Sequence, residues 1–191
     1  MLHATLEDMT SIYKPTKLEI AAAYNQTLPD IIDSNLKVVF CGINPSLYSA
    51  AVSHHFARPG NRFWKTLHAA GFTEKLMSPF EDRSLLNRGY GLTNIVPRAT
   101  ARADELSADE LVLGQQELTA KMQQYQPKFL AVLGISAYRV AFDQPKAKMG
   151  LQPGAIADTA IWVLPNPSGL NAHYQLDGLK RVYEELRLVA S

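Results

Sequence analysis

Short apolar segments alternate with amphipathic ones along most of the chain. Four apolar runs, closed by Gly, Pro or polar turn residues, have the pattern of strands buried on both faces, at residues 37–43, 90–96, 129–134 and 160–165. Apolar residues at helical spacing predict helices at residues 61–70, 107–125 and 176–186. Because strands alternate with helices, the sequence predicts an α/β fold, a three-layer α/β/α sandwich around a central four-stranded parallel sheet.

The first 36 residues have a less regular pattern, with one candidate helix at residues 18–24 before Pro29. We treat residues 1–36 as an N-terminal extension packed on the domain, and residues 37–191 as the α/β domain. The 191 residues contain no internal repeat, low-complexity tract or linker, so one domain accounts for the chain.

Composition excludes several kinds of site. Hydrophobic residues make up 47% of the chain and charged residues 19%, so it can bury a core without help from disulfides. Cys41 is the only cysteine, which excludes a disulfide framework, an iron–sulfur cluster and a Cys-rich zinc site. The adjacent His54 and His55 point apart in an extended loop, and no cluster of Cys or carboxylates completes a site. We therefore expect no metal and no cofactor.

Charge and hydropathy limit the classes of partner that the protein could bind. The 19 Lys and Arg residues against 18 Asp and Glu leave a net charge of +1, so any nucleic-acid contact must come from a local patch and from shape. The N-terminus lacks the positive region and apolar core of a secretory signal, and no apolar run approaches the roughly 20 residues that span a bilayer. We expect a cytoplasmic monomer with no membrane contact.

Two of the predicted strands end in the same kind of turn. Asn44-Pro45-Ser46 follows the first strand, and Asn166-Pro167-Ser168 follows the last. Proline holds the preceding residue out of the helical region, which fixes the direction of each carboxamide at the sheet edge where parallel α/β folds bind ligands. The alternative for either turn alone is an ordinary Asn-Pro turn whose side chain caps its own backbone.

These turns belong to four blocks that stand in the order and at about the spacing of a known family. The blocks lie at residues 38–45, 54–64, 91–96 and 166–170. On these motifs the chain resembles the mismatch-specific uracil-DNA glycosylase and thymine-DNA glycosylase family. The resemblance implies the α/β/α fold above and a monofunctional glycosylase that flips uracil out of double-stranded DNA at a G·U mismatch and hydrolyses its N-glycosidic bond. The product would be an abasic site in base excision repair.

The resemblance also implies roles for residues of the site. Asn44 matches the residue that positions the attacking water, and Phe56 matches the aromatic side chain that stacks on the base. The backbone amides of Ile43 and Phe56 would bind the uracil carbonyls, and His55 matches a residue of the pocket rim. Asn166 stands where faster uracil glycosylases have a histidine, so it either stabilises the departing base or only shapes its turn.

Further positions implied by the resemblance complete the site. Ser46 and Ser49 would line the pocket floor, and a hydroxyl at Ser46, where relatives usually have Gly, would crowd the 5-methyl group of thymine. Asn94 could face the pocket or cap a strand end. The segment Gly169-Leu170-Asn171 matches the wedge that fills the gap left by the flipped nucleotide, although Leu170 could instead pack under the last helix.

Two other functions compete with the glycosylase. A non-catalytic sensor could flip and hold damaged bases without cutting, because no carboxylate or histidine of the site is a clear general base. A nucleotide-binding domain is less well supported, because Gly89-Tyr90-Gly91 lacks the third glycine of a dinucleotide fingerprint and no Walker-type loop is present.

Overall fold

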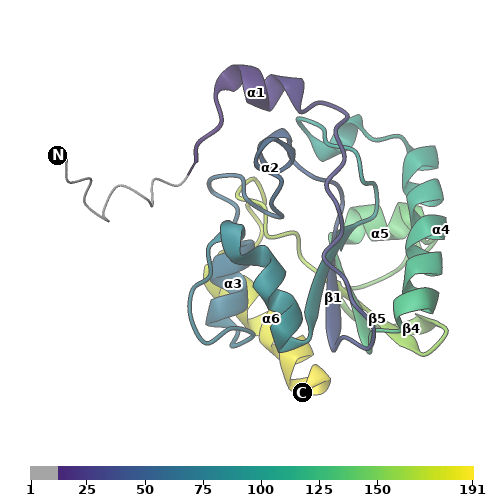
Figure 1. Ribbon diagram of the computed structural model, residues 1–191. Helices are drawn as coiled ribbons and strands as arrows, with labels where there is room; N and C mark the ends of the chain where they lie inside the picture. Colours follow the sequence, from purple (N-terminus) through teal and green to yellow (C-terminus); the bar gives the residue numbers. More distant parts are fainter. Residues whose placement is uncertain (1–12) are drawn as a thin grey trace.

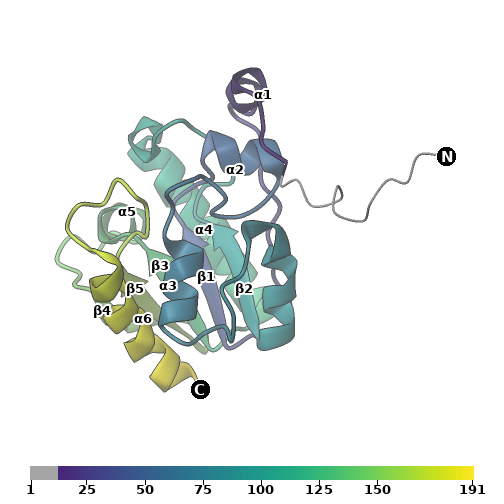
Figure 2. The same cartoon turned by 90° about the vertical axis from the view of Figure 1, so that its left-hand side faces the viewer.

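A five-stranded sheet forms the centre of the computed structural model, which describes residues 13–191 (Figures 1 and 2). Its strand order is β2-β1-β3-β5-β4. The strands are β1 (Val38–Gly42), β2 (Tyr90–Asn94), β3 (Phe129–Leu133), β4 (Gly150–Ile156) and β5 (Thr159–Leu164). The four strands predicted from apolar runs are β1, β2, β3 and β5, and they pair in parallel.

The prediction of a four-stranded sheet is wrong by one strand. β4 lies at the edge, antiparallel to β5, with a register shift between Leu151 and Ala155. Its sequence carries no apolar run because only one of its sides is hydrogen-bonded and most of its residues remain accessible. Pro153 and Gly154, which normally argue against a strand, are tolerated at such an irregular edge.

Helices cover both faces of the sheet, which confirms the expected layers. The α-helices are α1 (Lys17–Ala22), α2 (Leu47–Val52), α3 (Phe63–Ala69), α4 (Ala108–Tyr125), α5 (Ile135–Ala141) and α6 (Leu176–Ala190). Two 3₁₀ helices, η2 (Pro79–Arg88) and η3 (Ala103–Glu105), flank β2 in the sequence. Figure 2 shows α3 and α6 in front of the sheet, while α4 and α5 lie behind it.

The alternation of side chains along β1 divides the apolar interior into two cores. Val38 and Phe40 face the core beneath α3 and α6, where Phe40 makes edge-to-face contacts with Phe63. Val39 and Cys41 face the core beneath α4 and α5. A strand buried on both faces must be apolar at every position, which is why its sequence is continuous rather than alternating.

The segment before β1 covers the open edge of β2. Ile31 exchanges two backbone hydrogen bonds with Leu92, of 2.9 and 2.7 Å, and Gln26 accepts one from Ala99. Leu28 reaches the pocket described below. Residues 1–12 of the predicted N-terminal extension lie outside the described residues.

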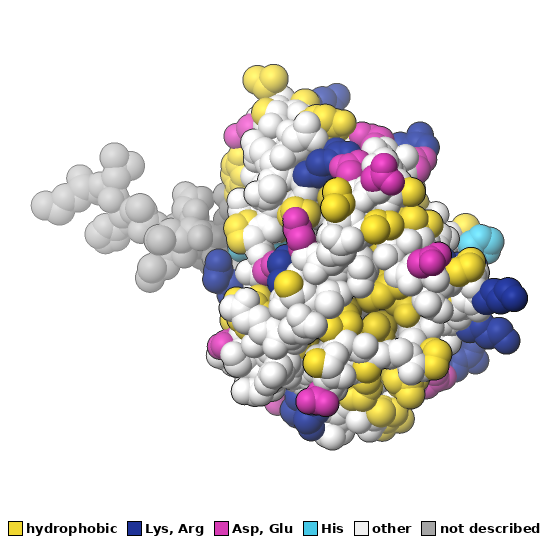
Figure 3. Space-filling view, turned by 90° about the vertical axis from the view of Figure 1, so that its right-hand side faces the viewer, with side chains coloured by type: hydrophobic (Ala, Val, Ile, Leu, Met, Phe, Trp, Pro, Cys, Tyr) yellow, Lys and Arg dark blue, Asp and Glu magenta, His cyan; other side chains and the backbone are white. Residues whose placement is uncertain are grey.

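The face formed by α4, α5 and β4 carries apolar side chains around a hollow of about 840 Å³ (Figure 3). Among the described residues, no helix is long and apolar enough to cross a membrane.

Candidate active site

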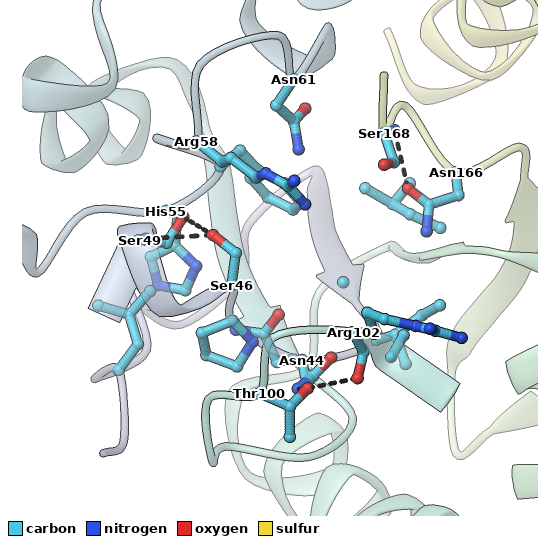
Figure 4. Close-up of a pocket in the computed structure, with 18 of the residues that line it drawn as sticks. Asn44, Ser46, Ser49, His55, Arg58, Asn61, Thr100, Arg102, Asn166 and Ser168 are labelled. Atoms are coloured by element: carbon cyan, nitrogen blue, oxygen red, sulfur yellow. Dashed lines mark hydrogen bonds between the residues drawn. The ribbon is translucent and has the colours of Figure 1, made fainter. Parts of the chain in front are cut away.

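A pocket of about 290 Å³ opens at the carboxyl ends of the parallel strands (Figure 4). This is the edge at which parallel α/β sheets bind ligands. Nine of the predicted site residues line it: Ile43, Asn44, Ser46, Ser49, His55, Phe56, Asn94, Asn166 and Leu170. Gly169 and Asn171 of the predicted wedge lie beside the pocket without lining it.

Asn44 has a fixed orientation because its amide nitrogen has two acceptors. Nδ2 donates to the Arg98 carbonyl at 3.1 Å and to the Thr100 hydroxyl at 2.7 Å. The Thr100 hydroxyl in turn donates to the Arg102 carbonyl at 2.7 Å, so it must accept from Asn44. Both hydrogens of the carboxamide are therefore used, and within residues 13–191 nothing donates to its oxygen. That oxygen is the atom available to a ligand or a water.

Ser46 and Ser49 join the first turn to the loop that follows α2. Ser46 caps α2 by accepting a hydrogen bond from the Ser49 amide at 3.1 Å, and the two hydroxyls are also 3.1 Å apart. The Ser49 hydroxyl accepts from the Ala57 amide at 3.0 Å. The floor of the pocket thus anchors the loop that carries the aromatic residue.

His55 is a buried residue of the pocket wall and holds the same loop in place. Its side chain is 2% exposed, and Nε2 lies 3.0 Å from the Pro29 carbonyl, which can only accept, so Nε2 carries the proton. Burial lowers the pKa of His55, an effect that the bond to Pro29 opposes. The His55 carbonyl accepts from the Trp64 indole at 3.2 Å. The neutral ring therefore supports the loop rather than offering a charge.

Phe56 is held with a left-handed backbone, φ 53°, which is unusual for an aromatic residue. Its ring stacks on that of Phe63 at 4.0 Å between centroids. The amides on either side of it are both anchored, the preceding one to the Asp82 carboxylate at 3.1 Å and the following one to Ser49. The Phe56 N–H itself makes no hydrogen bond within residues 13–191. The loop thus presents one aromatic face and one free amide at the pocket.

Asn94 lies against Gly42 at the back of the pocket. A Cβ at Gly42 would stand 2.5 Å from the Asn94 Oδ1 and 3.4 Å from the Phe56 ring, so the absence of a side chain here leaves the space that the end of the Asn94 side chain occupies. The Asn94 side chain is 6% exposed and forms no hydrogen bond within residues 13–191. The Ile43 carbonyl accepts from the Val96 amide at 3.0 Å, which keeps the first turn close to this strand end.

Asn166 has the opposite orientation to Asn44. Its Oδ1 accepts from the Ser168 amide at 2.9 Å, which shapes the turn, and its backbone carbonyl accepts from the Asn171 side chain at 3.0 Å. Nδ2 has no partner among the described residues. One end of the amide holds the turn, and the other is a free donor at the pocket.

Leu170 protrudes from the loop of residues 165–174, which we call the wedge loop. The side chain is 75% exposed, so it does not pack under α6. A Cβ at Gly169 would stand 2.6 Å from the Gly60 carbonyl oxygen, so the wedge loop touches the loop before α3. Asn171 also accepts from the His173 amide at 3.1 Å, so its side chain is engaged within the loop at both ends.

Comparison with known proteins shows the superfamily and the fold of the chain. A family model described as the uracil DNA glycosylase superfamily matches residues 29–187. The chain belongs to the uracil DNA glycosylase superfamily. A solution NMR structure described as "a putative Uracil DNA glycosylase from Methanosarcina acetivorans" is 18% identical, with a TM-score of 0.57 over 85% of this chain and 98% of that one. This likeness shows a shared fold.

Membership of the uracil DNA glycosylase superfamily confirms the resemblance at the level of the superfamily. It supports a DNA glycosylase, a hydrolase of N-glycosidic bonds that acts on uracil in DNA repair. The mismatch-specific family within the superfamily remains a hypothesis.

Several residues at the pocket of this glycosylase fold were not predicted. They are Leu28, Arg58, Asn61, Thr100, Arg102 and Asp104. Thr100 has the most direct connection to the predicted site, through Asn44, but it lies 56 residues away in the sequence. Nothing in the local pattern around Thr100 could have revealed that contact.

The charges near the pocket are on its rim. Arg58 is exposed, and Arg102 forms an ion pair with Asp104.

His54 lies outside the pocket lining, with Nδ1 3.1 Å from the Asp82 carboxylate but without the alignment of a hydrogen bond. Across residues 13–191, no three His, Cys, Asp or Glu side chains gather as metal ligands would.

Proposed function

We propose that this protein is a monofunctional DNA glycosylase that removes uracil opposite guanine from double-stranded DNA. It would leave an abasic site for base excision repair and would be of the mismatch-specific uracil-DNA glycosylase and thymine-DNA glycosylase type. The observation that carries the proposal is the orientation of Asn44, whose carboxamide oxygen is the one free acceptor of a fully anchored amide at the pocket.

Phe56 and Asn94 supply the groups that would bind the flipped uracil. A base must leave the duplex before its glycosidic bond can be reached, and enzymes then stack it on an aromatic ring and bond its edge. The Phe56 ring supplies the stacking face, and its free N–H can donate to a uracil carbonyl. Asn94 has an unpaired amide at the same wall, which can bond both a carbonyl and a ring N–H.

The chemistry would use fixed amides in place of titrating groups. The Asn44 oxygen can accept a hydrogen bond from the attacking water and so hold it beneath the sugar. An amide is not a base at neutral pH, so this site lacks the roughly 10²–10⁴-fold that a positioned general base contributes, and slow chemistry is expected. The free Nδ2 of Asn166 would donate to the departing uracil anion.

A monofunctional reaction is supported by the groups at the pocket wall. A glycosylase that also cleaves the DNA backbone forms a Schiff base through an amine. Among the described residues that line the pocket there is no lysine. Water is then the nucleophile, and the abasic site is the product.

A lesion sensor is the second candidate, and the absence of a free general base among the described residues of the pocket favours it. The carboxylate of Asp104 on the pocket rim is paired with Arg102, and the His55 ring is buried and bonded to Pro29, so neither group is free to take a proton from water. A sensor would need the stacking and wedge residues but not the free oxygen of Asn44.

One assay separates the two functions. We expect the protein to convert a G·U duplex to an alkali-labile product under single-turnover conditions. Asn44→Ala should abolish most of the cleavage while leaving duplex binding within a few-fold, because only the water loses its partner. Asn87→Ala, at an exposed position in η2, is the matched control and should cut at the wild-type rate. Tight binding without cleavage by the wild type would support the sensor.

A further inference from the structure

The side chain of Arg62 binds the wedge loop at both of its ends. Nε donates to the Pro167 carbonyl at 3.3 Å and Nη2 to the Asn171 carbonyl at 3.0 Å. Nη2 also donates to the Ser168 carbonyl, and Nη1 to the Tyr174 carbonyl. One guanidinium therefore reaches four carbonyls, two before Leu170 and two after it.

The contacts of Arg62 are unusual for a partly buried cation. Among the ion pairs of residues 13–191, none involves Arg62, and the protein groups that its side chain binds are all backbone carbonyls. A guanidinium is planar and carries five N–H donors in a fixed fork, so it can hold several carbonyls in a single arrangement. Such a set of bonds fixes the geometry of a loop more tightly than one or two contacts would.

The two loops at the mouth of the pocket are also joined through their backbones. The Arg62 amide donates to the Pro167 carbonyl at 3.0 Å, and Gly169 touches Gly60. Arg62 lies at the start of α3, directly after the loop that carries Phe56. These contacts fix the position of Leu170 relative to Phe56, the proposed base-stacking residue. Figure 4 shows Asn61 and Ser168, one from each of the two loops, above the pocket.

We propose that Arg62 is a positioning residue that holds the wedge loop so that Leu170 enters the duplex while the base occupies the pocket. The proposal rests on the proposed function, because it assumes that Leu170 fills the gap left by a flipped base. An apolar side chain can stabilise an opened base step only if it is already aimed at that step. Without the guanidinium, the four carbonyls would turn to water and the loop would sample other conformations.

Hydrogen exchange tests the ordering of the loop without DNA. Arg62→Met removes the five donors and retains an apolar stem of similar length. We expect faster exchange at the amides of Leu170, Asn171 and His173, with the pattern of the central strands unchanged. Arg139→Met is the matched control, because Arg139 also binds a loop carbonyl, that of Ala147 at 2.7 Å, but far from the pocket. If Arg62→Met disturbs folding, Arg62→Lys replaces it, since one ammonium cannot reach all four carbonyls. Unchanged exchange in the wedge loop of a folded variant overturns the proposal.

A double-mutant cycle tests whether Arg62 acts through Leu170. Under single-turnover conditions on a G·U duplex, we expect Arg62→Met to slow cleavage by roughly tenfold to a hundredfold, the range for losing hydrogen bonds to a charged group. In the Leu170→Ala background the same change should have little further effect. If the loss of rate in the double variant equals the product of the two single losses to within about twofold, Arg62 and Leu170 act independently and the mechanism is refuted.

The cycle also separates this proposal from the proposed function. If the wild type cuts no uracil substrate, the glycosylase proposal fails, and the same four proteins are compared by their affinity for the G·U duplex. Coupling in binding then supports Arg62 as the positioning residue of a sensor. If the loop becomes mobile without a loss of rate or affinity, Leu170 is not the wedge and the role of Arg62 falls with it.

Discussion

Thr100 should control the rate of cleavage although it makes no proposed contact with the DNA. Its hydroxyl accepts from the Asn44 Nδ2 at 2.7 Å, and the residue is 1% exposed. In Thr100→Val the shape is retained, but one amide hydrogen of Asn44 loses its acceptor. The carboxamide can then rotate, and its oxygen no longer has one fixed direction.

The size of the effect follows from the partial burial of this hydrogen bond. Leaving a buried donor without an acceptor costs about 1–3 kcal/mol. If that cost appears as lost orientation of the water in the transition state, the single-turnover rate falls by about 5- to 150-fold. The affinity for the duplex should change little, because Thr100 supports Asn44 and not the base.

Three variants make this prediction refutable. Thr100→Ser keeps the hydroxyl and should cut within a few-fold of wild type, and Thr100→Val in the Asn44→Ala background should have no further effect. Single-turnover rates on a G·U duplex, with unfolding in urea as a control for stability, supply the comparison. A wild-type rate for Thr100→Val, or an equal loss for Thr100→Ser, would show that the hydroxyl does not orient Asn44.

Three further predictions concern other parts of the site. Because the wedge would hold the abasic product as firmly as the substrate, multiple-turnover assays should show a burst of about one equivalent, and linear turnover at the single-turnover rate would contradict this. Gly42→Ala should slow cleavage with little loss of stability, because the new Cβ would displace only the end of the Asn94 side chain, and a large fall in the urea midpoint would mean that the backbone moves instead. Burial lowers the pKa of His55 in the folded state, while in the unfolded chain this pKa is about 6.5. As the pH falls below about 6.5, the unfolded state therefore binds a proton that the folded state does not yet bind. Stability should therefore fall as the pH decreases through this value, less so in His55→Gln, and a pH-independent wild type would exclude the effect.

The central strands were predictable because burial leaves a local signal. Residues 38–42 are all buried, and their apolar run alone places β1 within a residue or two. β4 gave no such signal, since an edge strand with one hydrogen-bonded side accepts Pro153 and exposed residues. The short helices α2 and α5 were also missed. The equally short α3 was predicted because Pro59-Gly60 and Gly71 bound its apolar pattern on both sides, whereas no Gly or Pro follows α2 or α5 directly.

The site was predictable where a turn fixes a side chain, and not where distant segments meet. The Asn-Pro turns placed Asn44 and Asn166 at the carboxyl edge of the sheet, as their local backbone restrictions required. Thr100 and Arg62 contact partners 56 and more than 100 residues away. Thr100 lies outside the four blocks, and although Arg62 lies within the block at residues 54–64, nothing in that block indicates a contact with the wedge loop. Only the fold brings these residues together.

Three of the four asparagines that line the pocket, Asn44, Asn94 and Asn166, would let the proposed glycosylase act on a neutral base without a general base. In Asn44 the nitrogen is anchored and the oxygen is free, whereas in Asn166 the oxygen is anchored and the nitrogen is free. The first turn thus presents an acceptor, which suits the orienting of a water, and the second presents a donor, which suits the stabilisation of a departing anion. Asn94, with neither end anchored, can adapt to a base edge. Because all three groups are neutral amides, the chemical step should vary little between pH 6 and 8, in contrast to the stability of the fold, which depends on His55.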